Sequence, residues 1–555
     1  MNIKFTSLFL AVFLFLNSVV LSQTWNALGT GTNGQVNSLI VFNNLLIAGG
    51  DFTNAGGTAV SNIASWNGTS WSNLGGGLNG PVYSMIVFNG NLIVGGKFTI
   101  AGTVSANNIA QWNGTTWTAL GLGTNDTVFA LAIAGISLRV GGSFTSAGGV
   151  VCNRVAIWSG TAWSSMPGGA TNGLNNTVYA LTVSGSDIFI GGRFTQTSGG
   201  LTVNRITRYN TASGSYFTLG TGIDNNAVLS LIFFNNQLHV GGTFTSIGGS
   251  TVNNIARWTG SNWNAISTGT NGAVRSFSLS GTNLIVGGSF TNAGPISGVN
   301  GICSWNGTSF SALGNGVSGG SGTVNSTTTW RAVLIAAGNF TTAGDNNVPA
   351  NNIAAYGSVP AAPILISPPD GATGVSTTPT LDWSDVSNAS SYGVQVSQNA
   401  NFTSFVVNQS GLTNSEFTVG SGILSNNTTY FWRANASNGL GTSPFSLIRF
   451  FTTGTVGIIN TGEIPAMFNL YQNYPNPFNP VTKIRFDLPA DAEAANVIIT
   501  VYDISGSVVK ELLNMPYKAG RWEIEFNATD YPSGVYFYRL QTDKYFDTKK
   551  LVLLK

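Results

Sequence analysis

The amino-acid sequence predicts an all-β protein, a seven-bladed β-propeller followed by two smaller β-sandwich domains. The first observation is a Gly-Gly-x-Phe-Thr motif whose Phe residues lie 46 or 50 positions apart, a spacing that suits four-stranded propeller blades. The motif has its Phe at Phe52, Phe98, Phe144, Phe194, Phe244 and Phe290, with a degenerate copy at Phe340. The second observation is that Gly or Asn interrupts short β-rich runs every few residues, without helical periodicity.

A single repeat has the pattern of one blade. Residues 82–88, 92–99, 108–113 and 116–121 are β-rich runs, and residues 100–107 between the second and third runs are a polar loop. The runs are apolar on both faces, which is typical of strands packed between neighbouring blades. The Gly pair lacks Cβ atoms, so we expect the backbone there to approach a neighbouring sheet closely. A phosphate-binding loop is disfavoured, because a strand and not a helix N-terminus follows the motif.

Large aromatic residues recur at two positions of the repeat. They are Trp66, Trp112, Trp158, Tyr209, Trp258, Trp305 and Tyr356 in the third run, and Trp71, Trp117, Trp163, Tyr216, Trp263 and Phe310 in the fourth. Periodic aromatics of this kind usually anchor packing between blades. The alternative is a row of sugar-stacking platforms, and we favour the packing role.

The seventh repeat is incomplete, and the start of the chain supplies what it lacks. Its third run, at 352–358, is followed by an unrelated segment. The absent fourth run has the form aromatic-x-x-Leu-Gly, which Trp25 to Gly29 match. We therefore expect residues 23–30 to complete blade seven, which removes two exposed sheet edges and places the propeller at 23–358.

Residues 1–22 are typical of a signal peptide. A Lys is followed by a short apolar core and a small-residue cleavage site, which predicts Sec export into the periplasm. A membrane anchor is the alternative, but the apolar stretch is shorter than the ~20 residues of a spanning helix.

Composition excludes several function classes. Only 8% of residues are charged and the net charge is +2, so a nucleic-acid partner is not expected. The two cysteines, Cys152 and Cys303, fall at different repeat positions, and we expect buried thiols and not a disulfide.

Candidate catalytic residues are few. The propeller's acids are Asp51, Asp126, Asp187, Asp224 and Asp345, each in a different blade and at an unrelated position. His239 is the only histidine, and we interpret it as a satisfied, partly buried side chain and not as a general base. One His and two separated Cys do not provide a catalytic zinc or copper site. The sequence therefore predicts no enzyme and no cofactor, with a structural calcium held by a Gly/Asn loop as an open alternative.

Several segments resemble known families. The propeller repeat resembles kelch-type blades, without the Tyr of that family, and resembles more closely the extracellular repeats of fungal bud-site landmark proteins. This resemblance covers about 25–358 and implies a fold and a display role. Residues 361–453, with Trp383 in an early strand and Leu424 and Tyr430 spaced like a tyrosine corner, look like a fibronectin type III domain.

Residues 464–555 hold about half of all the acids, and this change in composition marks a further domain. Four blocks, at 470–489, 501–512, 532–540 and the chain end, are similar to the C-terminal sorting domain of the type IX secretion system. The resemblance implies a small β-sandwich that the translocon reads and a sortase removes. It implies a passenger that is released or attached to surface lipopolysaccharide. The matching sorting-signal residues are Pro532, Gly534, Tyr536, Lys550, Leu551 and Val552.

The function that these observations favour is a secreted or surface-displayed β-propeller that binds a glycan or protein ligand without catalysis. The alternatives are an enzyme that acts on polysaccharide at one propeller face, and a structural component of a surface layer. No residue of the propeller is predicted as a ligand contact.

Overall fold

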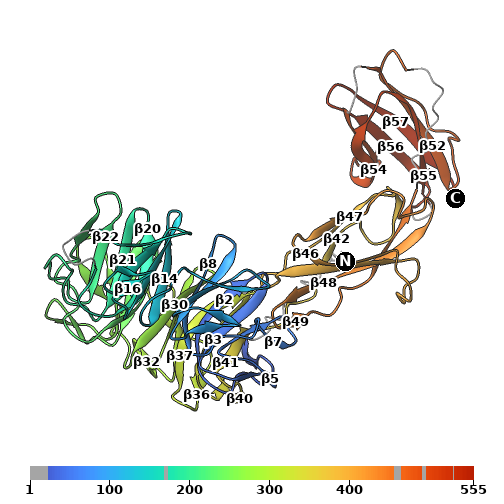
Figure 1. Ribbon diagram of the computed structural model, residues 1–555. Helices are drawn as coiled ribbons and strands as arrows, with labels where there is room; N and C mark the ends of the chain where they lie inside the picture. The colour runs from blue at the N-terminus through green and yellow to red at the C-terminus, as the bar shows by residue number, and fades with distance from the viewer. Residues whose placement is uncertain (1–22, 168–172, 455–463, 491–494, 529–530) are drawn as a thin grey trace, which may run out of the picture. The chain divides into compact units, whose positions relative to one another are not determined.

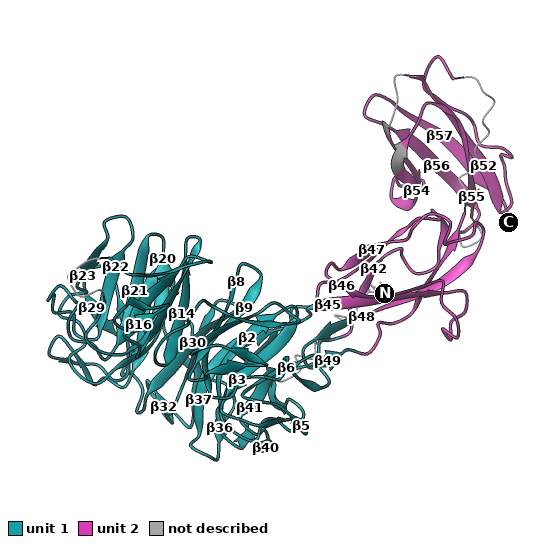
Figure 2. Ribbon diagram, in the orientation of Figure 1, with its two compact units in different colours: residues 1–361, 386–390, 436–443 teal, residues 362–385, 391–435, 444–555 magenta. Residues whose placement is uncertain are grey.

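The computed structural model describes residues 23–167, 173–454, 464–490, 495–528 and 531–555. The predicted signal peptide at 1–22 lies outside these residues. The chain is all-β, as the sequence predicts, with the strands β1 to β57. Two compact units are distinguished: residues up to 361 with 386–390 and 436–443, and the remaining residues (Figure 2). In the part of the chain that is described, no helix is long and apolar enough to cross a membrane.

The first unit contains seven four-stranded antiparallel sheets, each with an inner, second, third and outer strand. The inner strands are β2 (Val36–Phe42), β8 (Val82–Phe88), β14 (Val128–Ala134), β20 (Val178–Ser184), β24 (Val228–Phe234), β30 (Val274–Ser280) and β37 (Thr323–Trp330). The second strands are β3 (Leu45–Gly50), β9 (Asn91–Gly96), β15 (Ser137–Gly142), β21 (Asp187–Gly192), β25 (Gln237–Gly242), β31 (Asn283–Gly288) and β38 (Val333–Asn339). The third strands are β6 (Ile63–Trp66), β12 (Ile109–Trp112), β18 (Val155–Trp158), β22 (Ile206–Asn210), β28 (Ile255–Trp258), β34 (Ile302–Trp305) and β41 (Ile353–Gly357). The outer strands are β7 (Trp71–Asn73), β13 (Trp117–Ala119), β19 (Trp163–Ser165), β23 (Ser215–Phe217), β29 (Trp263–Ala265), β35 (Phe310–Ala312) and β1 (Thr24–Ala27).

The sheets are arranged as a closed ring. Each inner strand contacts the inner strands of both neighbouring sheets, and β37 contacts β2. Figure 1 shows the blue strands β2 and β3 beside the yellow strands β37 and β41. Within the last sheet β1 pairs with β41, with Trp25 opposite Tyr356. The sheet that the interrupted seventh repeat leaves short is thus completed by the strand that follows residue 22.

The Gly pair of the motif allows neighbouring blades to approach each other. A Cβ atom on Gly95 would lie 2.5 Å from Cγ1 of Val128, the first residue of the next inner strand. The equivalent first Gly faces the equivalent Val in every blade from the first to the sixth. Blade seven has Ala337 at this position. The close approach to a neighbouring sheet is the role that the sequence predicts for the pair.

The Thr of the motif has a partner that the sequence interpretation missed. The side-chain oxygen of Asn33 accepts hydrogen bonds from the backbone N–H groups of Thr53 and Asn54, and its amide donates to the Thr53 hydroxyl. Equivalent bonds to the Thr residues of the next five blades are made by Asn79, Asn125, Asn175, Asn225 and Asn271.

These bonds hold the segment after the motif, which the sequence predicted as a polar loop. In blades one, two, three, five and six this segment instead forms a hairpin of two short strands. The pairs are β4 (Asn54–Ala55) with β5 (Thr58–Ala59), β10 (Ile100–Ala101) with β11 (Val104–Ser105), β16 (Ser146–Ala147) with β17 (Val150–Val151), β26 (Ser246–Ile247) with β27 (Ser250–Thr251), and β32 (Asn292–Ala293) with β33 (Ile296–Ser297). In blade seven β39 (Thr342–Ala343) pairs with β40 (Val348–Pro349) and β36 (Val317–Ser318).

The periodic aromatics form one ring pair per blade. The centroid distances are 4.7–5.3 Å, and the pair in the last blade joins Trp25 of β1 to Tyr356 of β41. The outer-strand Trp also links blades, because the indole of Trp117 donates to the Leu74 carbonyl of the preceding blade at 3.0 Å. Equivalent bonds are made by Trp25, Trp71, Trp163 and Trp263. The aromatics are thus packing residues, as the sequence favours.

The second unit contains two sandwiches. In the first, one sheet contains β42 (Leu365–Ser367), β44 (Thr380–Trp383) and β47 (Glu416–Thr418). The other contains β43 (Ala372–Val375), β50 (Arg449–Thr453), β48 (Thr429–Asn438), β45 (Ser391–Ser397) and β46 (Val407–Leu412). Trp383 and Trp432 are buried in its core. The hydroxyl of Tyr430 accepts a 2.8 Å hydrogen bond from the Ser425 N–H, which is the geometry of a tyrosine corner.

The C-terminal sandwich has a three-stranded and a four-stranded sheet. The first contains β51 (Asn469–Leu470), β52 (Val481–Leu488) and β55 (Gly520–Asn527). The second has the order β54 (Val508–Tyr517), β53 (Ala495–Tyr502), β56 (Gly534–Gln541) and β57 (Phe546–Leu553), so the last strand of the chain is an edge strand. A core that includes Phe486, Ile499, Tyr538 and Leu551 lies between the two sheets.

Candidate ligand site at the propeller centre and candidate sorting strands

Each inner strand of the propeller has a β-bulge at the same place. The ladder between β2 and β3 pairs Val36 with Gly50 and Ser38 with Gly49, so the residue between them has no partner. The bulged residues of the seven blades are Asn37, Tyr83, Phe129, Tyr179, Leu229, Arg275 and Asn325. A bulge redirects the side chain of its extra residue. Seven side chains that differ in chemistry are therefore turned the same way, near the start of each inner strand.

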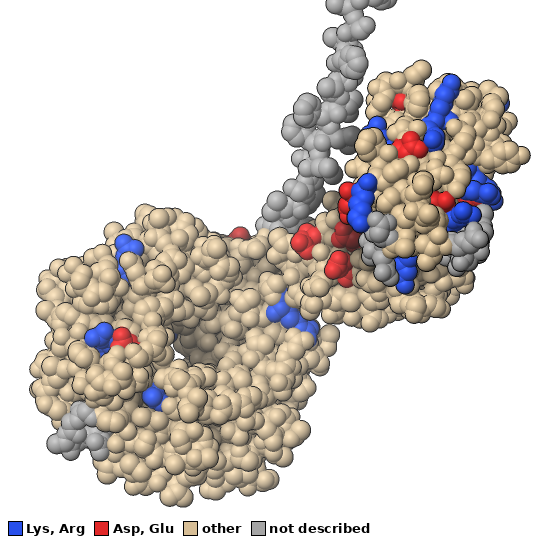
Figure 3. Space-filling model, turned by 90° about the horizontal axis from the view of Figure 1, so that it is seen from above, with Lys and Arg blue, Asp and Glu red and all other residues tan. Residues whose placement is uncertain are grey.

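These seven side chains and Gln35 line one cavity of about 320 Å³. Because every inner strand contributes one residue, the cavity lies on the axis of the ring. Figure 3 shows the propeller as a ring that is hollowed at its centre, with few charged side chains on the face seen. The volume is at the lower end of the ~300–1,000 Å³ that small-molecule sites occupy.

One side of the cavity is aromatic. The rings of Tyr83 and Phe129 have centroids 5.0 Å apart, and those of Phe129 and Tyr179 are 5.2 Å apart, so three successive blades form a continuous arc. All three rings are half-buried. Burial and, to a lesser extent, the nearby Asp51 raise the pKa of Tyr83, which keeps its hydroxyl protonated. We call Tyr83, Phe129 and Tyr179 the aromatic arc.

The other side of the cavity is polar. The amide of Asn325 donates to the Val36 carbonyl at 3.2 Å and to Oδ1 of Asn37 at 3.4 Å. The amide of Asn37 in turn donates to the Val82 carbonyl at 3.0 Å. Arg275 is exposed, and it has no ion-pair or hydrogen-bond partner among the residues that the structure describes. This side therefore presents a guanidinium and carboxamides that are held in place by the backbone.

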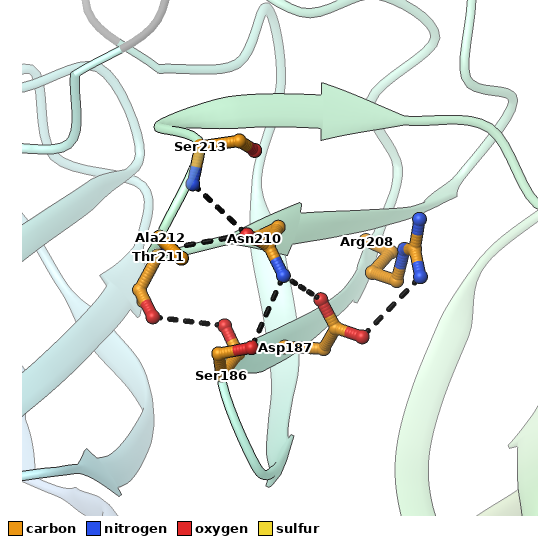
Figure 4. Close-up of polar contacts among 7 residues, drawn as sticks. All are labelled: Ser186, Asp187, Arg208, Asn210, Thr211, Ala212 and Ser213. Carbon is orange, nitrogen blue, oxygen red and sulfur yellow. Dashed lines mark hydrogen bonds and ion pairs between the residues drawn. The ribbon is translucent and has the colours of Figure 1, made fainter.

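Four of the five propeller carboxylates, those of Asp126, Asp187, Asp224 and Asp345, have separate polar partners. Figure 4 shows Asp187 with Nη1 of Arg208 at 3.3 Å and with the amide of Asn210 at 2.7 Å, in a network that also holds the turn after β22. Asp126, Asp224 and Asp345 accept hydrogen bonds from backbone N–H groups of Thr127, Gly248, Gly249 and Asn315. Within the described residues, no hydrogen-bond or ion-pair partner is common to two of these carboxylates.

His239 lies on β25 and is 2% exposed. Its Nδ1 is 3.0 Å from the Gln237 carbonyl, while Nε2 is buried without a partner in the described part of the chain. The sequence predicted a satisfied and partly buried histidine, so this is a correction: the ring is almost fully buried and half satisfied. Burial lowers its pKa, the Gln237 carbonyl opposes this, and Arg257 on β28 lowers the pKa further.

A pH dependence of stability follows from this burial. Folding holds the pKa of His239 below the ~6.5 of an unfolded chain, so the unfolded state binds the extra proton first. The free energy of unfolding should be unaffected by His239 above pH 6.5 and should fall as the pH is lowered from there towards the folded pKa. Urea unfolding followed by Trp fluorescence between pH 7.5 and 5 measures this. His239→Leu, which gives this position the apolar character that it has in five of the other six blades, should flatten the curve. An identical slope in the variant would exclude His239 as the cause.

The cysteines and a metal site can be assessed directly. Cys152 and Cys303 are free and buried, and burial raises the pKa of both thiols. Buried thiols are what the sequence predicts. The described residues contain no group of three or more His, Cys, Asp or Glu side chains that could hold a metal ion.

Five of the six predicted sorting-signal residues lie on β56 and β57, and Pro532 lies just before β56. Tyr536 of β56 is opposite Leu551 of β57, and Val552 is opposite the residue after Gly534. Tyr536 donates a 2.7 Å hydrogen bond to the Pro532 carbonyl. Residues 534–536 and 550–552 of the two signal blocks thus lie in one antiparallel strand pair. Tyr536 and Leu551 are buried in the core, whereas Pro532 and Lys550 are exposed.

An earlier block of the same domain holds the terminal strand. The Lys550 carbonyl accepts hydrogen bonds from the side chains of Gln472 and Asn476, and Asn476 also accepts from the Val552 N–H at 2.9 Å. Phe478 bonds to the Val552 carbonyl through its N–H at 3.0 Å. The free edge of β57 is therefore paired with the 472–478 segment, and three sequence blocks that lie far apart form one surface.

The sequence does not predict the residues that line the cavity, because no single one of them is unusual. The signal that identifies them is comparative within the chain. In all seven blades the bulged residue follows a Val and precedes a Ser or Ala, as in Val36-Asn37-Ser38 and Val128-Phe129-Ala130. The middle residue alone changes between amide, aromatic, aliphatic and cationic side chains.

Two family models match the chain. One describes a secretion system C-terminal sorting domain and matches residues 472–554. The other describes a β-propeller domain of unknown function, DUF5122, and matches residues 235–259, which include β25 and β28. The chain is thus an all-β protein with a propeller and a type IX sorting domain. It is exported by the type IX secretion system, to the outer cell surface or into the medium.

Solved structures are similar to part of this chain. The structure of FN3tt mut is 26% identical, covers 18% of this chain and 97% of its own, and has a TM-score of 0.14. The chicken CNTN1 FN1–FN3 domains are 13% identical over 40% of this chain and 77% of theirs, with a TM-score of 0.16. Dimeric latent PorU from Porphyromonas gingivalis is 14% identical over 40% and 23%, with a TM-score of 0.14. A comparison with curated proteins finds no match.

Proposed function

We propose that this protein is a non-enzymatic binding protein of the outer cell surface or the medium, whose propeller binds carbohydrate in the central cavity. The observation that carries the proposal is the bulge ring: seven blades keep the same Val and small residue on either side of one variable residue. A scaffold that is constant around a varied, solvent-facing position is the arrangement of a ligand site on a rigid fold.

Carbohydrate fits the chemistry of the cavity. A pyranose has an apolar face that stacks on aromatic rings and a rim of hydroxyls that exchange hydrogen bonds with amides and phenols. The aromatic arc supplies the first, and Asn37, Asn325 and Gln35 supply the second. The eight residues that line the cavity include no carboxylate, imidazole or thiol, which supports binding without catalysis.

The sorting domain completes the proposal. The translocon reads Lys550 and the other exposed signal residues on the β56–β57 pair, and a sortase then removes the domain. The propeller is then released or attached to surface lipopolysaccharide, with the fibronectin-like sandwich as its spacer. The resemblance of the C-terminal blocks to other sorting domains supports these steps.

A glycan-array screen of the purified protein, followed by calorimetry on the oligosaccharides that bind, tests the function. Phe129→Ala, at the middle of the arc, should weaken binding about 10-fold, or roughly 1.4 kcal/mol. Phe217→Ala is the matched control, because Phe217 is an exposed aromatic on the outer strand β23. An array without any binding, or equal affinity in both variants, would refute the site. Release of reducing ends from a bound glycan would favour the enzyme alternative.

A further inference from the structure

We infer that the carbohydrate bound in the cavity is an acidic saccharide and that Arg275 binds its carboxylate or sulfate group. The inference rests on the proposed function and adds the ligand class. It depends on the one charged side chain of the bulge ring, on its position relative to the aromatic arc, and on the charges near the cavity.

Arg275 is the only charged residue among those that line the cavity. It is exposed and unpaired in the described structure, whereas the Arg208 guanidinium of the same propeller forms an ion pair with Asp187. A guanidinium presents a rigid fork of donors that matches the two oxygens of a carboxylate or of a sulfate ester. At the positions equivalent to Arg275 the other six blades carry neutral side chains, so nothing in the fold requires a cation there.

The position of Arg275 suits a ligand that spans the cavity. Arg275 is in the sixth blade and Phe129, the middle of the aromatic arc, is in the third, which is the largest separation in a ring of seven. A sugar ring stacked on the arc therefore has Arg275 across from it and not beside it. Asn325, in the blade next to Arg275, holds its amide through bonds to Val36 and Asn37, so the polar side is pre-organised.

The charges of the propeller favour an anionic ligand. The negative charge of Asp51 helps to raise the pKa of Tyr83, so this acid acts on the aromatic side of the cavity. Arg193 lies over the Tyr179 ring at 6.0 Å, which adds a second cation at the edge of the arc. Residues 23–358 contain nine Lys or Arg, five Asp and no Glu, a net charge of +4. An acidic ligand is therefore attracted to the propeller, where Arg275 is the one charged side chain that lines the cavity.

Calorimetric titration of the purified full chain tests the inference. The probes are trimers of galacturonate and of mannuronate, the methyl esters of both, and a sulfated galactan oligosaccharide. At least one acidic probe should bind about 10- to 100-fold more tightly than its uncharged counterpart, the range expected of a charge-assisted bidentate contact. The uronate and sulfate arms identify which anionic group is recognised. Raising the salt concentration should weaken binding of the acidic probe and leave binding of the neutral probe unchanged.

Arg275→Gln should remove the preference for the acidic probe and change the affinity for the neutral counterpart by less than about 2-fold. Arg331→Gln is the control, because it removes the same charge at the turn after β37, at the opposite end of an inner strand from the bulge. Equal binding of acid and ester, or an unchanged preference in Arg275→Gln, would overturn the inference. Neutral oligosaccharides that bind through the arc would then still support the proposed function, which fails only if no saccharide binds at all.

Discussion

Removal of residues 23–30 should lower the melting temperature of the propeller by about 10 °C or more, the largest loss expected from so short a deletion. The deletion takes away β1, whose Trp25 and the adjacent Leu28 are both 4% exposed. Loss of a buried large aromatic side chain or of a buried Leu costs about 2–5 kcal/mol of stability in each case. For a domain of this size, the summed loss of about 5–10 kcal/mol corresponds to a shift of about ten degrees.

The deletion also cuts the ring at two seams. The Trp25 indole donates to the Leu313 carbonyl of blade six at 2.7 Å, and the Leu28 carbonyl accepts from the Trp71 indole of blade one at 3.0 Å. Both bonds cross from the last blade to a neighbour, one on each side. Without β1 the edge of β41 is also unpaired, which favours association between chains.

Calorimetric scans of protein produced from residue 23 and from residue 31 measure the effect. Trp25→Ala should cost about 3–5 kcal/mol on its own. Thr24→Ala, at an exposed position of the same strand, should leave the melting temperature within about 1–2 °C. An unchanged melting temperature after deletion would contradict closure by β1.

The features that the sequence predicts are those that recur from one copy of the repeat to the next. Six of the seven blades have a Gly where the neighbouring Val approaches, and all seven have an aromatic pair at the outer edge, so these residues recur and identify the strands. The partner of β1 could be found for the same reason, because an aromatic-x-x-Leu-Gly segment has one role in this repeat. The all-β fold class was therefore predictable from periodicity and punctuation.

The ligand cavity could not be predicted from the same pattern. In a regular strand the side chains alternate, and Tyr83 would be assigned to a face by its position alone. The bulge is a shift in register between two strands, and it changes the direction of that side chain without an unusual residue to mark it. The Asn33–Thr53 bonds were missed for a related reason: they join residues 20 positions apart through turn geometry. In both cases the information lies in pairing between segments.

The blades also differ in ways that a repeat consensus conceals. Tyr216 and Phe310 replace the outer-strand Trp in blades four and six, so these two blades lack an indole to bond the preceding blade. The Tyr216 hydroxyl is instead buried without a partner in the described residues, and burial raises its pKa far above the usual range. The seams between blades three and four and between five and six are therefore held by packing without the indole bond.

Deletion of residues 533–555 should abolish surface display and leave the protein in the periplasm. The deletion removes β56 and β57, which carry both blocks of the sorting signal and the core residues Tyr536, Tyr538 and Leu551. Fractionation of cells and protease treatment of intact cells measure where the protein accumulates. Normal display of the truncated chain would refute the assignment of the signal to this strand pair.

The truncation alone does not distinguish a loss of recognition by the translocon from a loss of folding. A substitution of Lys550 does. Its side chain is exposed, while its carbonyl is held by Gln472 and Asn476, so Lys550→Ala leaves every bond of the backbone intact. Display should fall while the melting temperature of the domain stays within about 1–2 °C of the original. Lys518→Ala, also exposed and outside the two blocks, is the matched control and should be displayed normally. If Lys550→Ala is displayed as well as Lys518→Ala, the translocon reads the backbone and shape of the β56–β57 pair and not the lysine. That outcome would remove Lys550 from the signal while leaving the consequence of the deletion unchanged.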